Sequence, residues 1–111
     1  MAGRPFVVLV TCPTRRHARV LADALVRKRL AACVNILPGQ TESVYRWQGK
    51  VERTRETLLL IKTQSSHFER LRAEIRLLHP YDVPEIIAVP VAAGHRPYLQ
   101  WVASSLRALH Q

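Results

Sequence analysis

Three side chains in this chain are of the kind that binds soft or borderline metal ions: His79, Cys12 and Cys33. A neutral imidazole suits copper, zinc or nickel, and a thiolate suits Cu(I). His79 ends a predicted helix just before Pro80, where it could be partly exposed at a subunit boundary. It could equally interact with the negative end of that helix, and the cysteines could be small core hydrophobes. No CxxC pair or usual structural zinc pattern decides between ligand and core.

Charged residues on predicted strands form a second candidate group. Glu56 and Lys62 are six residues apart in an extended segment, so they face the same side, and Glu85 opens another strand after Pro84. Burying such charges is costly unless they are paired. They predict either a polar cleft between subunits that binds an anion or a metal, or an ion pair that fixes how the subunits align.

Catalytic patterns are missing from the sequence. No nucleophile-elbow motif surrounds Ser43, Ser65 or Ser66, and no HExxH spacing links the histidines. The chain is therefore not predicted to be an enzyme. The histidines are His17, His67, His79, His95 and His110.

The large aromatic residues are most simply interface and core residues, because amphipathic rings dominate interface energetics. Stacking on nucleobases is the alternative, but flanking glycines and a basic recognition motif are lacking. The residues concerned are Tyr45, Trp47, Tyr81, Tyr98 and Trp101.

Length and composition favour one soluble domain spanning residues 1–111, with 48% hydrophobic residues to build a core. No apolar run approaches the length of a membrane-spanning helix, and residues 6–10 are predicted to be a strand rather than a signal peptide. A cytoplasmic location is expected, and in that compartment the two cysteines are predicted to be free thiols.

The net charge is +9, from 17 Lys and Arg, 14 of them Arg, against 8 acidic residues. Such an excess can mark a nucleic-acid-binding protein. The arginines are spread over two predicted helices and a hairpin, and no nucleic-acid motif accompanies them. Solvated helix faces are the preferred interpretation, and a nucleic-acid partner is not expected.

Hydrophobic periodicity predicts the elements that must position these residues. Apolar strands are expected at residues 6–10, 33–36, 58–61 and 85–91. A helix capped by Thr14 follows the first strand, and a helix with a capping box at Ser66 to Glu69 precedes Pro80. A last helix begins at Pro97, and its apolar stripe includes Leu109. The order β-α-β-β-α-β plus a helix predicts an α+β, ferredoxin-like fold with an antiparallel sheet.

Residues 43–63, SVYRWQGKVERTRETLLLIKT, predict an unusually long hairpin. Gly49 suits a tight reversal because it tolerates positive φ. Fourteen extended residues from Lys50 reach about 46 Å, whereas a compact domain of roughly 100 residues is only about 34 Å across. The exposed strand edges and aromatic residues of a projecting hairpin predict an oligomer.

Several short motifs occur in a fixed order: CVNI from Cys33, SVYRWQGK from Ser43, Glu56, Lys62-Thr63, HPYDVPEII from His79, and YLQW from Tyr98. Over residues 6–108 the chain strongly resembles the CutA family of divalent-cation tolerance proteins. The resemblance implies a ferredoxin-like subunit, a tight cytoplasmic homotrimer, and a role in tolerance of copper and other divalent ions. Family members proposed to bind copper have sometimes been assigned paired histidines before Pro-Tyr, where this chain has Leu78 and His79.

The resulting hypothesis is a trimeric metal-tolerance protein that binds divalent ions weakly through His79, with Cys12 and Cys33 as further ligands. A cleft between subunits is expected to contain Asn35, Tyr45, Trp47, Glu56, Lys62, Tyr81, Glu85 and Trp101. The alternative, by analogy of architecture, is a signalling module resembling PII-type trimers, with a small effector bound in such clefts.

Overall fold

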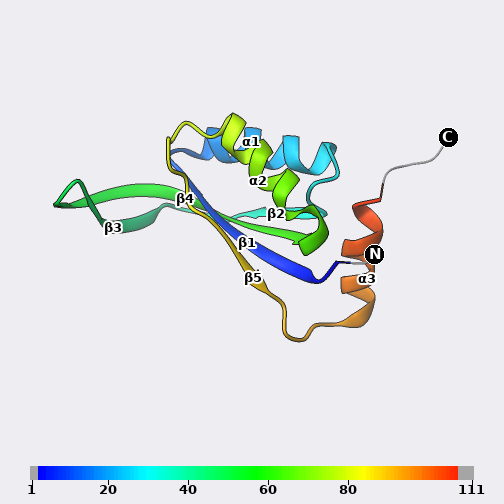
Figure 1. Ribbon diagram of the computed structural model, residues 1–111. Coiled ribbons are helices and arrows are strands. Elements are labelled where there is room, and N and C mark those ends of the chain that lie inside the picture. The colour runs from blue at the N-terminus through cyan, green and yellow to red at the C-terminus, as the bar shows by residue number, and fades with distance from the viewer. Residues whose placement is uncertain (1–2, 108–111) are drawn as a thin grey trace.

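A computed structural model describes residues 3–107 of the chain. Eight main elements and one short 3₁₀ turn follow one another (Figure 1). Their bounds are β1 Pro5–Cys12, α1 Arg15–Arg27, β2 Cys33–Ile36, β3 Thr41–Trp47, β4 Lys50–Gln64, η1 Ser65–His67, α2 Phe68–Leu78, β5 Ile86–Pro90 and α3 Arg96–Ser105.

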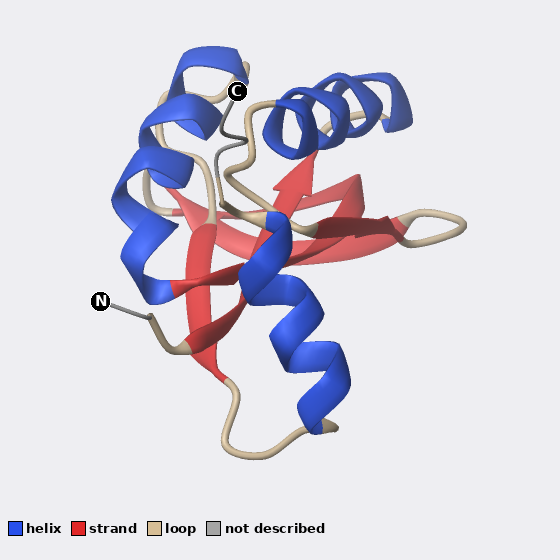
Figure 2. Cartoon of the chain, turned by 90° about the vertical axis from the view of Figure 1, so that its right-hand side faces the viewer, coloured by secondary structure: helices blue, strands red, loops and turns tan. Residues whose placement is uncertain are grey.

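The strands form one antiparallel sheet in the order β2-β4-β1-β5, and β3 pairs with the first half of β4. Figures 1 and 2 place α1 and α2 on one face of this sheet and α3 apart from them. The predicted α+β, ferredoxin-like fold with an added C-terminal helix is therefore confirmed. No helix within residues 3–107 is long and apolar enough to cross a membrane.

The core lies between the sheet and the two crossover helices. Val8, Val10 and Cys12 alternate along β1 towards the helices, as period-two geometry requires, and they pack with Leu21 and Leu25 of α1. The helix α1 begins where predicted, because Thr14 Oγ1 accepts a hydrogen bond from the backbone N–H of His17.

The capping box predicted at Ser66 is wrong. A 3₁₀ turn occupies residues 65–67, His67 is the N-cap residue of α2, and no side chain caps the helix. Ser66 Oγ instead contacts His67 Nδ1, so its hydroxyl is not available to the backbone of α2. Leu109 and His110 lie outside the described residues.

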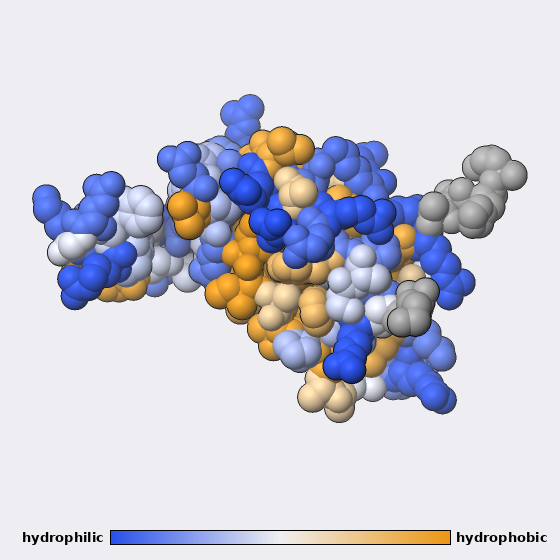
Figure 3. Space-filling model, in the orientation of Figure 1, coloured by the Kyte–Doolittle hydropathy of each residue, from blue (hydrophilic) through white to orange (hydrophobic). Residues whose placement is uncertain are grey.

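The hairpin of β3 and β4 stands clear of the main body and makes the molecule 49 Å long, against 31 and 24 Å in the other directions (Figure 3). Its two-residue loop, Gln48-Gly49, has positive φ at both positions, 50° and 78°. This combination is the signature of a type I′ turn, which suits the twist of paired strands. The predicted projection of the hairpin is confirmed.

The sheet face that points away from α1 and α2 is apolar at its centre. Residues paired directly across the strands share a face, and these pairs are Val7 with Val89, and Leu9 with Ile87 and Leu60. Ile87 and Val89 are about half exposed. We call this surface the open face; α3 lies at the end of the sheet away from the hairpin (Figure 1).

Candidate functional site

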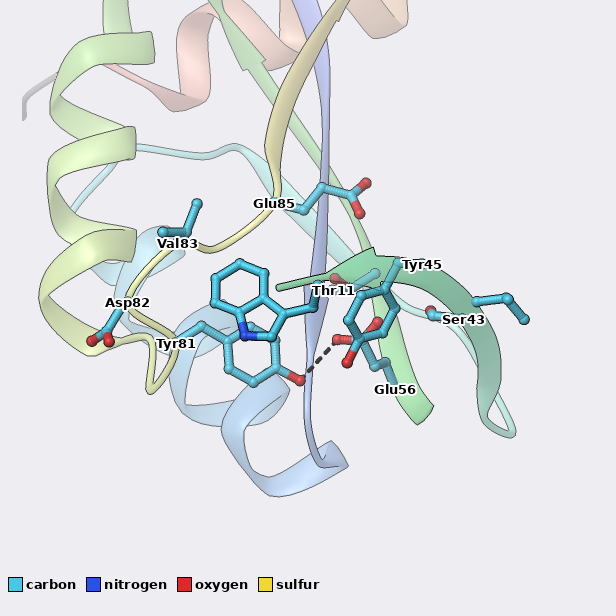
Figure 4. Close-up of a pocket in the computed structure, with 10 residues that line it drawn as sticks. Thr11, Ser43, Tyr45, Glu56, Tyr81, Asp82, Val83 and Glu85 are labelled. Carbon is cyan, nitrogen blue, oxygen red and sulfur yellow. Dashed lines mark hydrogen bonds between the residues drawn. The ribbon is translucent and has the colours of Figure 1, made fainter. Parts of the chain in front are cut away.

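A pocket of about 560 Å³ lies where the hairpin joins the main sheet (Figure 4). It is built from the end of β1, strand β3 from Ser43 to Trp47, Glu56 of β4, and the loop between α2 and β5. We call it the hairpin pocket. Its lining residues are Thr11, Ser43, Val44, Tyr45, Trp47, Glu56, Tyr81, Asp82, Val83 and Glu85.

Glu56 lies in the wall of the hairpin pocket and is only 7% exposed. It occupies the point where β4 changes partner: Glu56 pairs with Thr41 in the hairpin and the next residue, Thr57, pairs with Cys12 in the main sheet. Its Oε2 accepts a 2.8 Å hydrogen bond from the hydroxyl of Tyr81 (Figure 4). Burial, and then this bond to a carboxylate, raise the pKa of the Tyr81 phenol, so it stays a proton donor at neutral pH.

His79 fixes the loop that carries Tyr81. Its Nδ1 accepts a 3.1 Å hydrogen bond from the backbone N–H of Tyr81, so Nε2 carries the proton and donates to the carbonyl of Thr11 at 2.7 Å. The His79 and Tyr81 rings lie 4.8 Å apart. His79 is 7% exposed, so the expected partial exposure of this side chain is wrong: helix α2 ends against β1 and buries it.

The three candidate metal ligands do not come together in one subunit. Cys12 and Cys33 pair with Thr57 and Lys62, five residues apart on β4, or about 16 Å. Cys12 points into the core, whereas Cys33 lies on the open face beside Lys62. Within residues 3–107, no group of three His, Cys, Asp or Glu side chains is placed to hold one ion.

Cys12 is held as a neutral thiol. Burial first, and then the negative charge of Glu56, raise the pKa of Cys12 from 9.0 to about 11. A metal ion that used this sulfur would have to displace its proton.

Lys62 belongs to a second group, on the open face at the far end of β4. Its ammonium donates to Asn35 Oδ1 on the neighbouring strand β2, rather than to Glu56, which is about 20 Å away along β4. Tyr98 of α3 approaches Cys33 here, and burial followed by the nearby thiol raises the pKa of Tyr98. The rings of Tyr98 and Trp101 are 5.6 Å apart.

The residues predicted for the cleft thus divide into two groups within one subunit. Five of them line the hairpin pocket: Tyr45, Trp47, Glu56, Tyr81 and Glu85. Asn35 and Lys62 form the far group, with Trp101 nearby on α3. Sequence reasoning missed Thr11, Ser43, Val44, Asp82 and Val83; the signal available for the last two was the HPYDVPEII motif, which places them beside Tyr81.

The fold and the pocket define a class of protein, namely ferredoxin-like subunits whose central hairpin extends past the domain. Residues 6–105 match the family model of the CutA1 divalent ion tolerance protein. The chain therefore belongs to the CutA1 divalent ion tolerance family.

Individual relatives agree with this assignment. The divalent-cation tolerance protein CutA of Thermus thermophilus is 55% identical over 96 residues, covering 86% of this chain and 92% of that protein. Its solved structure superposes with a TM-score of 0.88 at 51% identity, covering 91% of this chain and 97% of that one. CutA1 of Oryza sativa superposes with a TM-score of 0.90 at 44% identity, covering 96% of each chain.

Some relatives are longer than the matched region. Protein CutA of Homo sapiens is 51% identical over 100 residues, which cover 90% of this chain and 55% of the human protein. The chain therefore spans about half the length of that relative.

Proposed function

We propose that the chain forms a homotrimer that acts in tolerance of copper or another divalent metal ion. Membership of the CutA1 family supports the link to divalent ions. The observation that carries the proposal of assembly is the hairpin, which extends past the domain with Tyr45 and Trp47 43% and 49% exposed.

Assembly would bury surfaces that a single subunit leaves in water. Val44 and Val51 on the hairpin, and Ile87 and Val89 on the open face, are all at least 45% exposed. Removing apolar surface from water contributes about 25 cal/mol per Å². Three copies arranged around the open faces would cover these residues and complete the free edges of the long strands.

Such an arrangement would make the hairpin pocket a cleft between subunits. In this proposal the far group of a sister copy, Asn35 and Lys62, joins the hairpin pocket of its neighbour, together with the nearby Trp101. Lys62 would then lie in the same cleft as Glu56, across the interface rather than within one chain. This reunites the residues that one subunit separates by about 20 Å along β4.

Metal binding in this proposal is weak. His79 would have to give up its 2.7 Å hydrogen bond to Thr11 before Nε2 could bind an ion, and Cys12 would have to lose a tightly held proton. Cys33 lies too far from both to share the same ion, so it would need ligands from another subunit. Copper is the favoured ion because imidazole and thiolate both suit it.

Two measurements test the proposal separately. Sedimentation equilibrium at micromolar concentration should give the mass of three chains, and a single-chain mass would refute the trimer. Isothermal titration with Cu(II), Cu(I) and Zn(II) should show weak, saturable uptake that His79→Ala reduces. His95→Ala is the control, because His95 is an exposed histidine at the start of α3. No uptake, or uptake unchanged by His79→Ala, would remove the metal site.

The proposed location is the cytoplasm, supported by the two free cysteines. Cys33 is partly exposed, and a reducing compartment keeps such a thiol free. A structural relative from Archaeoglobus fulgidus, 33% identical with a TM-score of 0.89 over 93% of this chain and 99% of that one, is described as periplasmic. Fractionation of the native host, with markers for each compartment, decides between the two locations.

A second candidate function is a PII-like role, in which the trimer binds a small effector. The observation that favours it is the hairpin pocket, whose volume lies in the range usual for small-molecule sites. The hairpin itself is a paired β-structure rather than a mobile effector loop. A thermal-shift screen with nucleotides, small anions and small cations tests this role; no shift with any of them would argue against it.

A further inference from the structure

The hairpin pocket has a negative centre, although the chain as a whole carries a charge of +9. No Lys, Arg or His lines it, whereas Glu56, Asp82 and Glu85 do. In Figure 4 the carboxylates of Asp82 and Glu85 point away from the Tyr81–Glu56 pair, so Glu56 provides the central charge. This sign opposes the binding of a nucleotide or another anion.

The Glu56 residue is more than nine-tenths buried, and one of its two carboxylate oxygens is free to accept a hydrogen bond. Tyr81 satisfies Oε2, whereas Oε1 bonds to no described residue; since no buried side-chain oxygen in the described part of the chain lacks a partner, Oε1 is open to the pocket. Nor does any described Lys, Arg or His form an ion pair with this carboxylate. A carboxylate oxygen that is open to the pocket and has no counter-charge can accept a charge-assisted hydrogen bond from a ligand that brings a positive N–H group.

Aromatic side chains surround this carboxylate. Tyr45, Trp47 and Tyr81 all line the hairpin pocket, and their ring faces attract cations. Figure 4 shows the Tyr81 hydroxyl directed at the Glu56 carboxylate, with the Tyr45 ring overlapping the carboxylate in this view. Aromatic rings around a carboxylate suit a large, weakly hydrated cation better than a compact, strongly hydrated one.

A bare metal ion fits this pocket poorly. Divalent ions need several ligands within about 2.0–2.6 Å, and no group of three His, Cys, Asp or Glu side chains exists for this in the described part of the chain. The volume of about 560 Å³ also greatly exceeds that of one ion.

We infer that the hairpin pocket binds a small organic cation with N–H donors, of the guanidinium or primary-amine class, through Glu56 and the surrounding aromatic rings. The N–H groups donate to Glu56 Oε1, and the cation lies against Tyr45, Trp47 and Tyr81. This inference rests on the second function proposed above, the binding of a small effector, and gives that effector a chemical class.

The test compares methylguanidinium with methylurea, which has the same planar shape and no charge. Isothermal titration of the assembled protein at constant ionic strength should show saturable binding of methylguanidinium and none of methylurea. Equal binding of both probes, or no saturable binding of methylguanidinium, overturns the inference.

Matched variants locate the contact. Glu56→Gln keeps an oxygen that can accept from Tyr81 but removes the charge, and should weaken methylguanidinium binding by about tenfold or more, as expected for loss of a charge-assisted hydrogen bond. Glu52→Gln removes the same charge from the same face of β4 but outside the pocket lining, and should change binding by less than about twofold. Equal losses in the two variants would contradict a direct contact with Glu56.

The positive group could instead come from Lys62 of a second copy. In that case Glu56→Gln and Lys62→Gln would each weaken assembly, the double variant would be no worse than either, and methylguanidinium would not bind; this result overturns the inference. The trimer mass and the copper titration are measured independently of the probe. Failure of the organic-cation site therefore leaves the trimer and metal proposals standing, and their failure leaves this one testable.

Discussion

The hydroxyl of Tyr81 donates a 2.8 Å hydrogen bond to Glu56, and this contact joins two parts of the chain that are 25 residues apart. Glu56 marks the base of the hairpin, and Tyr81 belongs to the loop after α2. His79 holds the Tyr81 loop against β1, because it bonds to both the backbone N–H of Tyr81 and the carbonyl of Thr11. The position of the hairpin relative to the sheet and the shape of the hairpin pocket therefore depend on the same few bonds.

Tyr81→Phe should lower the free energy of unfolding by about 1–3 kcal/mol, because it leaves the buried Glu56 carboxylate without its hydrogen-bond donor. Urea unfolding at a fixed protein concentration measures the change. Tyr45→Phe is the matched control, since Tyr45 lines the same pocket but its hydroxyl bonds to no described residue. Similar effects of the two substitutions would show that the Tyr81–Glu56 bond contributes little.

Stability should decline at alkaline pH. The pKa values of Cys12 and Tyr81 are raised in the folded state, that of Cys12 to about 11, so the unfolded chain loses these protons first as pH rises. Their contribution is complete below about pH 9 and is lost progressively above it. Urea midpoints between pH 7 and 11 should fall less for Cys12→Ala than for the unmodified chain, when each is compared with its own value at pH 7. Parallel curves would contradict this assignment.

The two cysteines should differ strongly in reactivity. Cys12 is 1% exposed and its raised pKa leaves about a hundredfold less thiolate at pH 8 than an ordinary thiol, whereas Cys33 is partly exposed on the open face. Iodoacetamide labelling followed by peptide mass spectrometry should modify Cys33 first. The variants Cys12→Ser and Cys33→Ser each isolate one thiol, and equal labelling rates in them would contradict the burial of Cys12 and its raised pKa.

Much of this fold could be predicted because its signals are local. The alternation of Ser43, Tyr45 and Trp47, followed by Gly49, predicted β3 and the turn, and the structure extends the hairpin only slightly, to Thr41 and Gln64. The helix α1 begins at its predicted cap for the same reason, since Thr14 and His17 are three residues apart.

The candidate site was harder to predict because it depends on contacts between distant segments. Periodicity places Glu56 and Lys62 on one face of β4 but says nothing of their partners, which are Tyr81 and Asn35. Likewise, Pro80 predicts where α2 ends, but the sequence does not predict that His79 packs against β1. Burial of His79 contradicts the expected partial exposure of its side chain, and its two hydrogen bonds show that it positions the Tyr81 loop.

The hairpin turn should be sensitive to glycine replacement. Gly49 has φ of 78°, in the left-handed region, and a Cβ there would meet no neighbouring atom, so the cost of Gly49→Ala is conformational and about 1–2 kcal/mol. Gln48, with φ of 50°, offers the opposite test: Gln48→Asn should be neutral or stabilising, because Asn-Gly is favoured in type I′ turns. Thermal unfolding of both variants measures the difference, and destabilisation by Gln48→Asn would argue against this turn geometry.

The hairpin aromatics should matter more to assembly than to the fold of one subunit. Trp47 is 49% exposed and lies outside the core, so Trp47→Ala removes little packing within the chain but a large apolar surface from the proposed interface. Leu77→Ala is the control, because Leu77 is 81% exposed on α2, in the helical layer away from the open face. Sedimentation equilibrium over a range of concentrations should show Trp47→Ala dissociating at higher concentration than the unmodified chain, with circular dichroism of each species unchanged. An unaltered assembly would place Trp47 outside the interface, whereas loss of the fold itself would show that the hairpin is needed by a single subunit.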